Sequence, residues 1–197
     1  MKIQTGYLYH IKDEFFDKIN DKGIMINHEN GHSRPSYLTI KDGKILWFIP
    51  LSSRIDKYKP IIDKKTKKYG SCKSIIIKKI AGKESVILIQ NAFPTIEKYV
   101  KSKHTVDGKH IKIASAVQRE IIDDFKYMLS LKTNGLNLFF TDIDNIKEKM
   151  LKELKWLSTN TQTTRVVSYL GNIPNTETRL EHLALTLIQL IARVSAY

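Results

Sequence analysis

The run SYLTIKDGKILWFIPL, residues 36–51, constrains the fold more than any other part of this sequence. Its two halves are rich in β-branched and aromatic residues, and they flank the dipeptide Asp42-Gly43. Asp-Gly is favoured at the centre of a type I′ turn because both central positions need a positive φ. The run therefore predicts an antiparallel hairpin, and residues 105–113 repeat the pattern around Asp107-Gly108.

The rest of the chain mixes strand-like and helix-like segments without the regular alternation of a βαβ protein. Short runs rich in Ile, Val and Tyr predict further strands at residues 3–11, 73–80 and 85–90. Helical spacing of apolar residues predicts helices at 13–21, 54–69, 114–131 and 143–157, the second interrupted or kinked near Pro60 and ended by Gly70. The expected fold class is α+β, a compact and strongly curved antiparallel sheet with peripheral helices.

Positive charge is the strongest feature of the composition. The 197 residues carry 33 Lys and Arg against 20 Asp and Glu, a formal net charge of +13. Nucleic acid is the leading partner for such a chain and an anionic membrane surface the second, while the alternative is a solvated lysine-rich surface that binds nothing. The single cysteine, Cys72, excludes a disulfide within the chain and is expected to act as a small buried apolar side chain. No run reaches transmembrane length and no signal-peptide region is present, so we expect a cytoplasmic protein.

The composition changes near residue 156. Every lysine lies before that point, and the last 42 residues hold three Arg and two Glu, a net charge of +1. We predict one functional domain at 1–155, followed at 156–197 by a linker, STNTQTT, and a C-terminal helix that is an accessory or added segment. No function is placed in this tail.

Motifs for metal or nucleotide chemistry are missing. The histidines form no H-E-x-x-H motif and no zinc-type pair with Cys72, and no glycine-rich loop ends in GK[ST]. His28 and His32 lie four residues apart, but in a glycine-containing loop rather than a helix. We expect no metal ion and no other cofactor.

Polar and basic residues instead gather at both open ends of the first hairpin. His28, His32 and Arg34 lead into the hairpin, and Ser52, Ser53, Arg54 and Lys57 follow it. Because the two ends of a hairpin meet in space, these groups are predicted to share one face. At least one serine is also expected to be the N-cap of the following helix, which is compatible with binding a phosphate at a helix N-terminus. The alternative for the histidines is an exposed loop position with no function.

A second set of residues fits a polynucleotide backbone. The basic run DKKTKKYGSCKSIIIKK is either a solvated face or the lining of a channel for phosphates, in which Lys64, Lys65, Lys68, Lys78 and Lys79 bind RNA. Tyr7 and Tyr9 are either core aromatics or platforms for base stacking. A metal-free cluster of His, Ser, Arg, Lys and Tyr suits RNA cleavage by the RNA's own 2′-hydroxyl, because the protein then needs no nucleophile.

The order YLYHIKDEFFDKI, RPSYLTI, WFIPLSSRIDKYK and SVILIQNAFPTIEKYV resembles the CptN branch of the ToxN/AbiQ toxins of type III toxin–antitoxin systems. The resemblance covers about residues 3–130, weakens toward 155, and rests most on IPLSSxxxKY and LIQxxFP. It implies a partly open β-barrel similar to the Kid/PemK/MazF toxins. It also implies a metal-independent, sequence-selective endoribonuclease that leaves a 2′,3′-cyclic phosphate. The implied partner is a repetitive antitoxin RNA, which the toxin processes into pseudoknotted units that bind and inhibit it in closed protein–RNA assemblies. Several such systems cause abortive phage infection.

The resemblance also implies site residues. The hydroxyl pair of the family falls on Ser52 and Ser53, its N-terminal tyrosine on Tyr9 rather than Tyr7, and its basic residue before the first hairpin strand on Arg34. This chain departs from the pattern at Ile55, where relatives carry a lysine, so that role passes to Arg54 or Lys57 or is lost.

These observations together predict an RNA-cleaving toxin. In the predicted site Ser53 and Ser52 hold the scissile phosphate, His28 is the acid or base, and Arg34 and Lys57 supply positive charge, while Tyr9, Tyr7, Arg54 and His32 bind RNA. The rival hypothesis is a non-catalytic, basic RNA-binding module. A membrane-surface protein is a weaker rival, because the C-terminal helix has too few cations.

Overall fold

Strand β5, Ile45–Ser52, is buried along its whole length and organises the sheet in the computed structural model, which describes residues 1–29 and 31–171. It pairs antiparallel with β4, Ser36–Asp42, with β8, Phe93–Ile96, and with β7, Lys83–Ile87. The remaining strands of this sheet are β6, Ile76–Ile80, next to β7, and β1, Leu8–Ile11, which joins β4 to β9, Val100–Lys103. The seven strands run in the order β6-β7-β5-β4-β1-β9, with β8 beside β5, and the sheet is not closed into a barrel.

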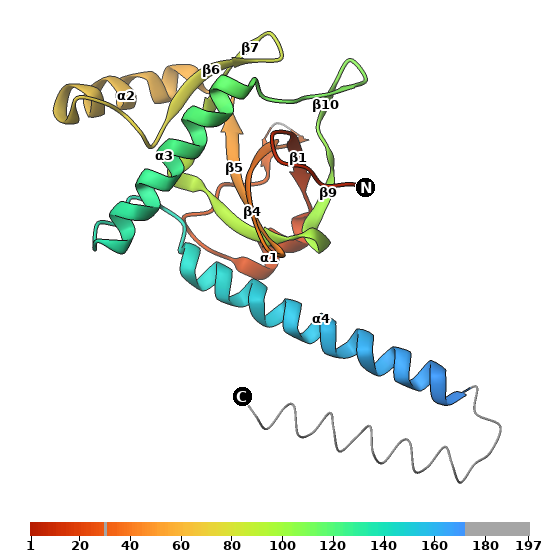
Figure 1. The fold of residues 1–197 in the computed structure, drawn as a ribbon. Helices are drawn as coiled ribbons and strands as arrows, with labels where there is room; N and C mark the ends of the chain where they lie inside the picture. Colours follow the sequence, from red (N-terminus) through yellow and green to blue (C-terminus); the bar gives the residue numbers. More distant parts are fainter. Residues whose placement is uncertain (30, 172–197) are drawn as a thin grey trace. The chain divides into compact units, whose positions relative to one another are not determined.

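The described residues also form helices (Figure 1). They are α1, Asp13–Ile19, α2, Ile55–Tyr69, α3, Ser115–Thr133, and α4, Ile143–Gly171, with short 3-10 turns at Ile89–Asn91 and Glu97–Tyr99. Two small ladders complete the described part, β2, His28–Glu29, with β3, His32–Ser33, and β10, Thr105–Val106, with β11, Lys109–His110. The predicted α+β class, an antiparallel sheet with peripheral helices, is confirmed. The resemblance implies a partly open β-barrel, and the sheet observed here is not closed.

The two predicted hairpins are present, but their turns differ. In the first, Asp42 pairs with Ile45, so the central residues are Gly43 and Lys44, one position later than predicted. Of these only Gly43 has a positive φ, of 58°, which is the pattern of a type II′ turn. In the second, Asp107 and Gly108 are the central residues with φ of 50° and 74°, which agrees with the predicted type I′ turn.

Several boundaries also differ from the prediction. Helix α2 runs through Pro60 without interruption, and it ends as predicted at Gly70, whose φ of 78° is the left-handed C-cap conformation. The predicted strand at residues 3–11 is shorter, beginning at Leu8. Residues 158–164, predicted as a linker, belong to α4. The predicted C-terminal helix lies outside the described residues.

An aromatic core holds several strands of the sheet together. Phe15 of α1 packs 5.3 Å from Phe93 of β8, and Phe48 of β5 lies 6.1 Å from Phe93 and 5.9 Å from Tyr9, measured between ring centroids. All four rings are buried. This core anchors β1, β5 and β8, and it therefore sets the position of Ser52 at the end of β5.

A smaller apolar cluster sits beneath α2. Its buried members are Tyr58, Ile75, Val86 and Leu88, and partly buried Cys72 and Ile55 pack against it. Cys72 thus makes apolar contacts, as predicted, although it is only partly buried.

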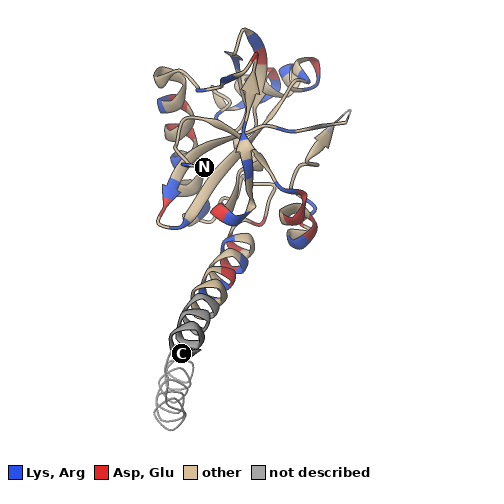
Figure 2. Cartoon of the chain, turned by 90° about the vertical axis from the view of Figure 1, so that its right-hand side faces the viewer, with Lys and Arg blue, Asp and Glu red and all other residues tan. Residues whose placement is uncertain are grey.

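The chain divides into two units, Met1–Leu151 and Lys152–Tyr197, and the described residues of the second unit are helical. Figure 2 shows the Lys and Arg residues of the first unit spread over its helices and hairpins, interleaved with Asp and Glu. No helix in the described ranges is long and apolar enough to cross a membrane.

Candidate functional site

The open end of the first hairpin brings Arg34 against the end of β5. The Leu51 N–H donates to the Pro35 carbonyl at 3.1 Å, and the Arg34 Nη1 donates to the Leu51 carbonyl at 2.7 Å. The Arg34 Nε also donates to the Ile26 carbonyl at 3.2 Å. The predicted meeting of the two hairpin ends is therefore observed, with a guanidinium fixed beside the two serines.

The two serines have different environments. Ser52 is buried, and its Oγ accepts the Arg54 N–H at 3.2 Å. Ser53 is exposed, and its carbonyl accepts the Ile55 N–H at 2.9 Å. The N-cap position of α2 belongs to Arg54, which has no side-chain cap, so the predicted serine N-cap is wrong. The Ser52 hydroxyl instead stabilises the turn between strand and helix, and Ser53 presents its side chain to solvent.

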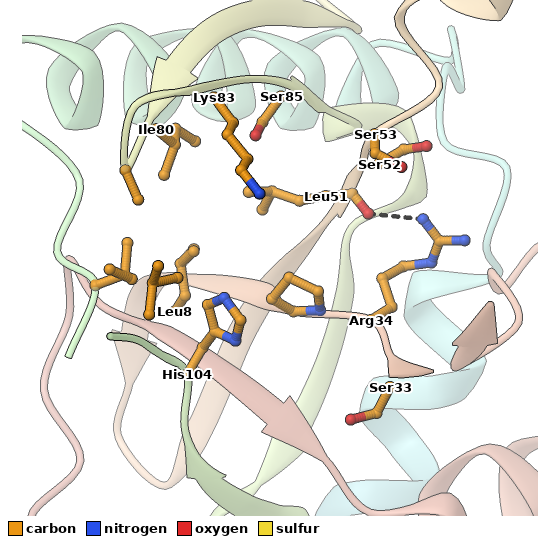
Figure 3. Close-up of a pocket in the computed structure, with 14 residues that line it drawn as sticks. Leu8, Ser33, Arg34, Leu51, Ser52, Ser53, Ile80, Lys83, Ser85 and His104 are labelled. Carbon is orange, nitrogen blue, oxygen red and sulfur yellow. Dashed lines mark hydrogen bonds between the residues drawn. The ribbon is translucent and has the colours of Figure 1, made fainter. Parts of the chain in front are cut away.

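A cavity of about 450 Å³ opens beside these serines (Figure 3). That volume falls in the range of sites that hold small ligands. Its polar lining comes from Ser33, Arg34, Ser52, Ser53, Lys83, Ser85 and His104, and its apolar lining from Leu8, Pro35, Leu51, Ile80, Ala81, Val106 and Ile111. Figure 3 shows the Lys83 ammonium and the His104 ring pointing into the cavity, with Ser52 and Ser53 near the Arg34 guanidinium.

Lys83 reaches the cavity because a tight turn precedes it, and the sequence carries no recognisable turn signal there. Ile80 pairs with Lys83, so Ala81 and Gly82 form the turn between β6 and β7, with φ of 49° and 81°. An alanine rarely adopts a positive φ, so Ala-Gly carries little hairpin signal. From the sequence, the role of the missing lysine passed to Arg54 or Lys57, or was lost, and Lys83, which lines this cavity, was not considered.

His104 is the end of a hydrogen-bonded chain of three side chains. Its Nδ1 lies 2.9 Å from the His10 Nε2, and the His10 Nδ1 lies 2.9 Å from the Ser33 Oγ. Burial lowers the pKa of His104 below the ordinary 6.5, and burial, followed by the neighbouring His104 and Lys101, lowers the pKa of His10. Both lowered pKa values favour the neutral imidazoles at pH 7. No sequence spacing connects these residues, since His10 lies on β1, Ser33 on β3, and His104 between β9 and β10.

A second cavity, of about 200 Å³, adjoins the first. Arg34 and Ser52 line both, and the second is completed by Met25, Ile26, His28, Arg54, Lys57 and Tyr58. The structure thus collects His28, Arg54 and Lys57 with Arg34 and Ser52, as their positions around the hairpin predicted.

His28 belongs to a small acidic network at this second cavity. Its Nε2 lies 2.5 Å from the Asp13 Oδ1, which also accepts the Asn27 Nδ2 at 2.7 Å. The Asn27 hydrogen bond is the main reason that the pKa of Asp13 lies below its ordinary value. Asp13, in the first turn of α1, therefore orients the His28 ring.

The two tyrosines that were predicted to bind RNA lie in different environments. Tyr9 is fully buried, its ring packs on Phe48, and its hydroxyl accepts the Gln4 N–H at 2.8 Å. A nucleobase cannot stack on this ring, so the prediction that Tyr9 binds RNA does not fit the structure. Tyr7 is only partly buried, and the ammonium groups of Lys103 and Lys112 lie 4.2 and 5.7 Å from its ring centroid. Tyr7 is thus the better placed of the two to meet RNA.

The predicted RNA-binding lysines also differ in whether their ammonium groups are exposed or are held by other protein groups. Lys64, Lys68 and Lys79 are exposed, while Lys78 pairs with Glu120 at 2.7 Å. Lys65 donates to the Ser74 Oγ at 2.7 Å and to the Gln90 Oε1 at 3.0 Å, so its ammonium is held by the protein rather than presented to a ligand. For His32 only the backbone is described, in β3 opposite Glu29.

This difference in environment can be tested by comparing two neighbouring lysines of α2. Lys65→Met is expected to lower the free energy of unfolding by about 1–3 kcal/mol, because two buried acceptors lose their donor. Lys64→Met, the matched control, is expected to change stability by less than about 0.5 kcal/mol. Urea unfolding of both variants measures the difference, and equal stabilities would show that the Lys65 contacts contribute nothing.

Ile55 packs on the apolar cluster beneath α2. The position at which the resemblance implies a lysine is thus used for apolar contacts here. Among residues 1–29 and 31–171, no group of three or more His, Cys, Asp or Glu side chains is placed to hold a metal ion. The candidate site is built from hydroxyls, imidazoles and cations.

Comparison with known proteins gives matches in structure only. No protein family profile and no curated protein sequence matches the chain. The structure of AbiQ, described as a lactococcal anti-phage endoribonuclease of the type III toxin–antitoxin system, matches with a TM-score of 0.58 and 14% identity, over 77% of this chain and 99% of AbiQ. A structure from work on bacterial type III toxin–antitoxin systems, described in terms of selective toxin inhibition by a non-coding RNA pseudoknot, matches with a TM-score of 0.56 and 17% identity, over 76% of this chain and 98% of the other. The chain therefore has the fold of the type III toxin–antitoxin structures of the ToxN/AbiQ kind.

Proposed function

We propose that this chain is a metal-independent, sequence-selective endoribonuclease toxin of a type III toxin–antitoxin system. It cleaves RNA by attack of the 2′-hydroxyl on the adjacent phosphate, leaving a 2′,3′-cyclic phosphate and a 5′-hydroxyl. The observation that carries the proposal is the convergence of Ser52, Ser53, Arg34 and Lys83 on one cavity, in a fold shared with AbiQ.

The cluster suits a phosphodiester. Ser53 donates its hydroxyl to a non-bridging oxygen, and the Arg34 guanidinium and the Lys83 ammonium neutralise the charge that grows on the pentavalent phosphorus. Arg34 is already fixed by its bonds to Leu51 and Ile26, so little reorganisation is needed when the transition state forms.

The second cavity receives the leaving side of the RNA. Because Arg34 and Ser52 line both cavities, a phosphate beside them has one cavity on each side. We assign His28, oriented by Asp13, as the acid that gives a proton to the departing O5′. Lys57 and Arg54 hold the next phosphate, and Lys64, Lys68, Lys79 and Tyr7 extend the contact along the RNA.

The partner that fits this proposal is an antitoxin RNA. A net charge of +13 supplies the long-range attraction for a folded RNA, and the structural relative whose inhibitor is an RNA pseudoknot provides the precedent. We propose that the toxin processes a repetitive transcript into units that then bind and inhibit it, in a hetero-oligomeric protein–RNA assembly in the cytoplasm of a bacterium under phage attack.

Cleavage in the absence of metal tests the function. The purified chain is incubated in EDTA with a 5′-labelled pool of randomised single-stranded RNA. We expect discrete cuts that leave a 2′,3′-cyclic phosphate, while a matched DNA pool, which lacks the 2′-hydroxyl, stays intact. Products that carry a 3′-hydroxyl, or cleavage that needs added Mg²⁺, would contradict the mechanism.

The competing hypothesis is a non-catalytic RNA-binding module, which the same charge and the same lysines favour. It predicts binding that weakens as salt rises, as both hypotheses do, but an intact RNA pool after prolonged incubation. Binding without any cleavage would therefore support the non-catalytic RNA-binding module.

A further inference from the structure

We propose that His104 is the general base of the cleavage reaction and that His10 and Ser33 are positioning residues that hold its ring in the tautomer able to accept a proton. The inference rests on the proposed RNA-cleaving function. It adds a catalytic group and its supporting chain to a site for which the sequence named only His28 as an acid or base.

The first support for the inference is the position of His104. Its ring points into the cavity that both serines, Arg34 and Lys83 line (Figure 3). Its Nδ1 faces His10, so Nε2 lies on the opposite edge of the ring, and no described residue is hydrogen-bonded to that Nε2. His104 thus offers one free ring nitrogen to the cavity.

The second support for the inference is the chain of hydrogen-bonded side chains behind the His104 ring. When the Ser33 Oγ accepts the His10 Nδ1–H, the His10 Nε2 has a lone pair and accepts the His104 Nδ1–H. In this arrangement the His104 Nε2 also has a lone pair and faces the cavity as an acceptor. Two rings that meet edge to face at 70°, with centroids 4.9 Å apart, restrict each other's rotation. The arrangement has the logic of a base oriented by a second group, which is in turn oriented by a third.

The electrostatic surroundings agree with a base that is neutral at pH 7. Burial lowers the pKa of His104, and the charged groups that face this region are cations, namely Lys83 and Arg34 in the cavity and Lys101 near His10. A base has to be unprotonated before the reaction, so a lowered pKa of His104 favours the active, neutral form at pH 7.

The chemical step balances. The His104 Nε2 takes the proton of the 2′-hydroxyl while a bond forms between O2′ and phosphorus, and the bond between phosphorus and O5′ breaks. The electron pair of that bond stays on O5′, which takes the proton of the protonated His28. His104 returns its proton to water and His28 regains one, so no net proton is consumed.

Kinetics on a single RNA oligonucleotide, chosen from the preferred cuts in the randomised pool, test the assignment. We expect His104→Ala to lower kcat by about 10²–10⁴-fold with little change in KM. Free imidazole added to His104→Ala should restore part of the rate, because it can occupy the space left by the ring. His110→Ala, the matched control on β11, has an exposed side chain outside both cavities and should retain wild-type activity and show no response to imidazole.

The positioning role has its own readouts. His10→Phe keeps a ring of similar volume but removes both hydrogen bonds, and it should lower kcat by less than His104→Ala does, with KM unchanged. In the wild-type protein kcat should rise with pH through an apparent pKa below 6.5, and this limb should be absent from His104→Ala.

Failure of the inference is distinguishable from failure of the function. If the wild-type protein leaves the RNA pool intact, the proposed function fails and the inference falls with it. If the wild-type protein cleaves and a folded His104→Ala cleaves at the same rate, only the inference is overturned, and the same holds if imidazole gives no recovery. Should His104→Ala not fold, His104→Gln, which keeps a polar side chain but cannot act as a base, replaces it under the same criteria.

Discussion

Replacing Ser53 with alanine is expected to lower the rate of RNA cleavage by about 10²–10³-fold, the usual cost of losing one donor to a developing negative charge. Ser53 is exposed at the mouth of the larger cavity, and no hydrogen bond of its Oγ stabilises the protein among the described residues. RNA affinity and Tm should therefore stay close to the wild-type values. Expression of the variant should no longer arrest growth.

Two further serine variants make this result specific. Ser115→Ala, an exposed serine at the start of α3 and outside both cavities, should cleave like the wild-type protein. Ser52→Ala should lose activity and also about 1 kcal/mol of stability, because the Arg54 N–H loses its acceptor. A Ser53→Ala protein that still arrests growth and cleaves at the wild-type rate would show that the scissile phosphate binds elsewhere.

Replacing Phe48 with alanine is expected to lower the free energy of unfolding by about 3–5 kcal/mol, a large part of the total of a domain of this size. The Phe48 ring is fully buried between Tyr9 and Phe93, so the change leaves a cavity in the middle of the sheet. Phe48 also lies on the strand that ends at Ser52, so cleavage activity should fall together with stability. Chemical unfolding followed by near-UV circular dichroism measures the effect.

Phe140→Ala is the matched control, since it removes the same ring from a side chain that is 61% exposed. Its stability should stay within about 0.5 kcal/mol of the wild-type value. A Phe48→Ala protein as stable as this control would mean that the aromatic cluster does not organise the sheet.

Local chemistry explains which parts of the fold could be predicted. The turn at Asp107 and Gly108 was located correctly because both residues tolerate a positive φ, and the end of α2 at Gly70 follows for the same reason. The first hairpin was also found, but its turn lies one residue later, because pairing across the whole length of β4 and β5 outweighs the preference of two turn residues. The strands β8 and β9 were missed because their short segments carry no alternating pattern and form only beside β5 and β1.

The same division applies to the candidate site. Ser52, Ser53 and Arg34 could be placed together from the sequence, because a hairpin joins its own two ends. Lys83, which enters from the turn between β6 and β7, could not, and neither could the contact of His10 with His104, which are 94 residues apart. The sequence also left Tyr9 open between the core and a stacking platform, and packing against Phe48 decides for the core.

By itself, the sequence determined the α+β class, the two hairpins, the basic character and the serine–arginine cluster at the end of the first hairpin. These properties depend on residues that are near one another in the chain or on the total charge. Only the tertiary structure decided which cation and which imidazole face those serines. Lys83 and His104 reach the cavity through strand pairings between distant segments, and the energy of those pairings comes from burial of the common core rather than from any local pattern.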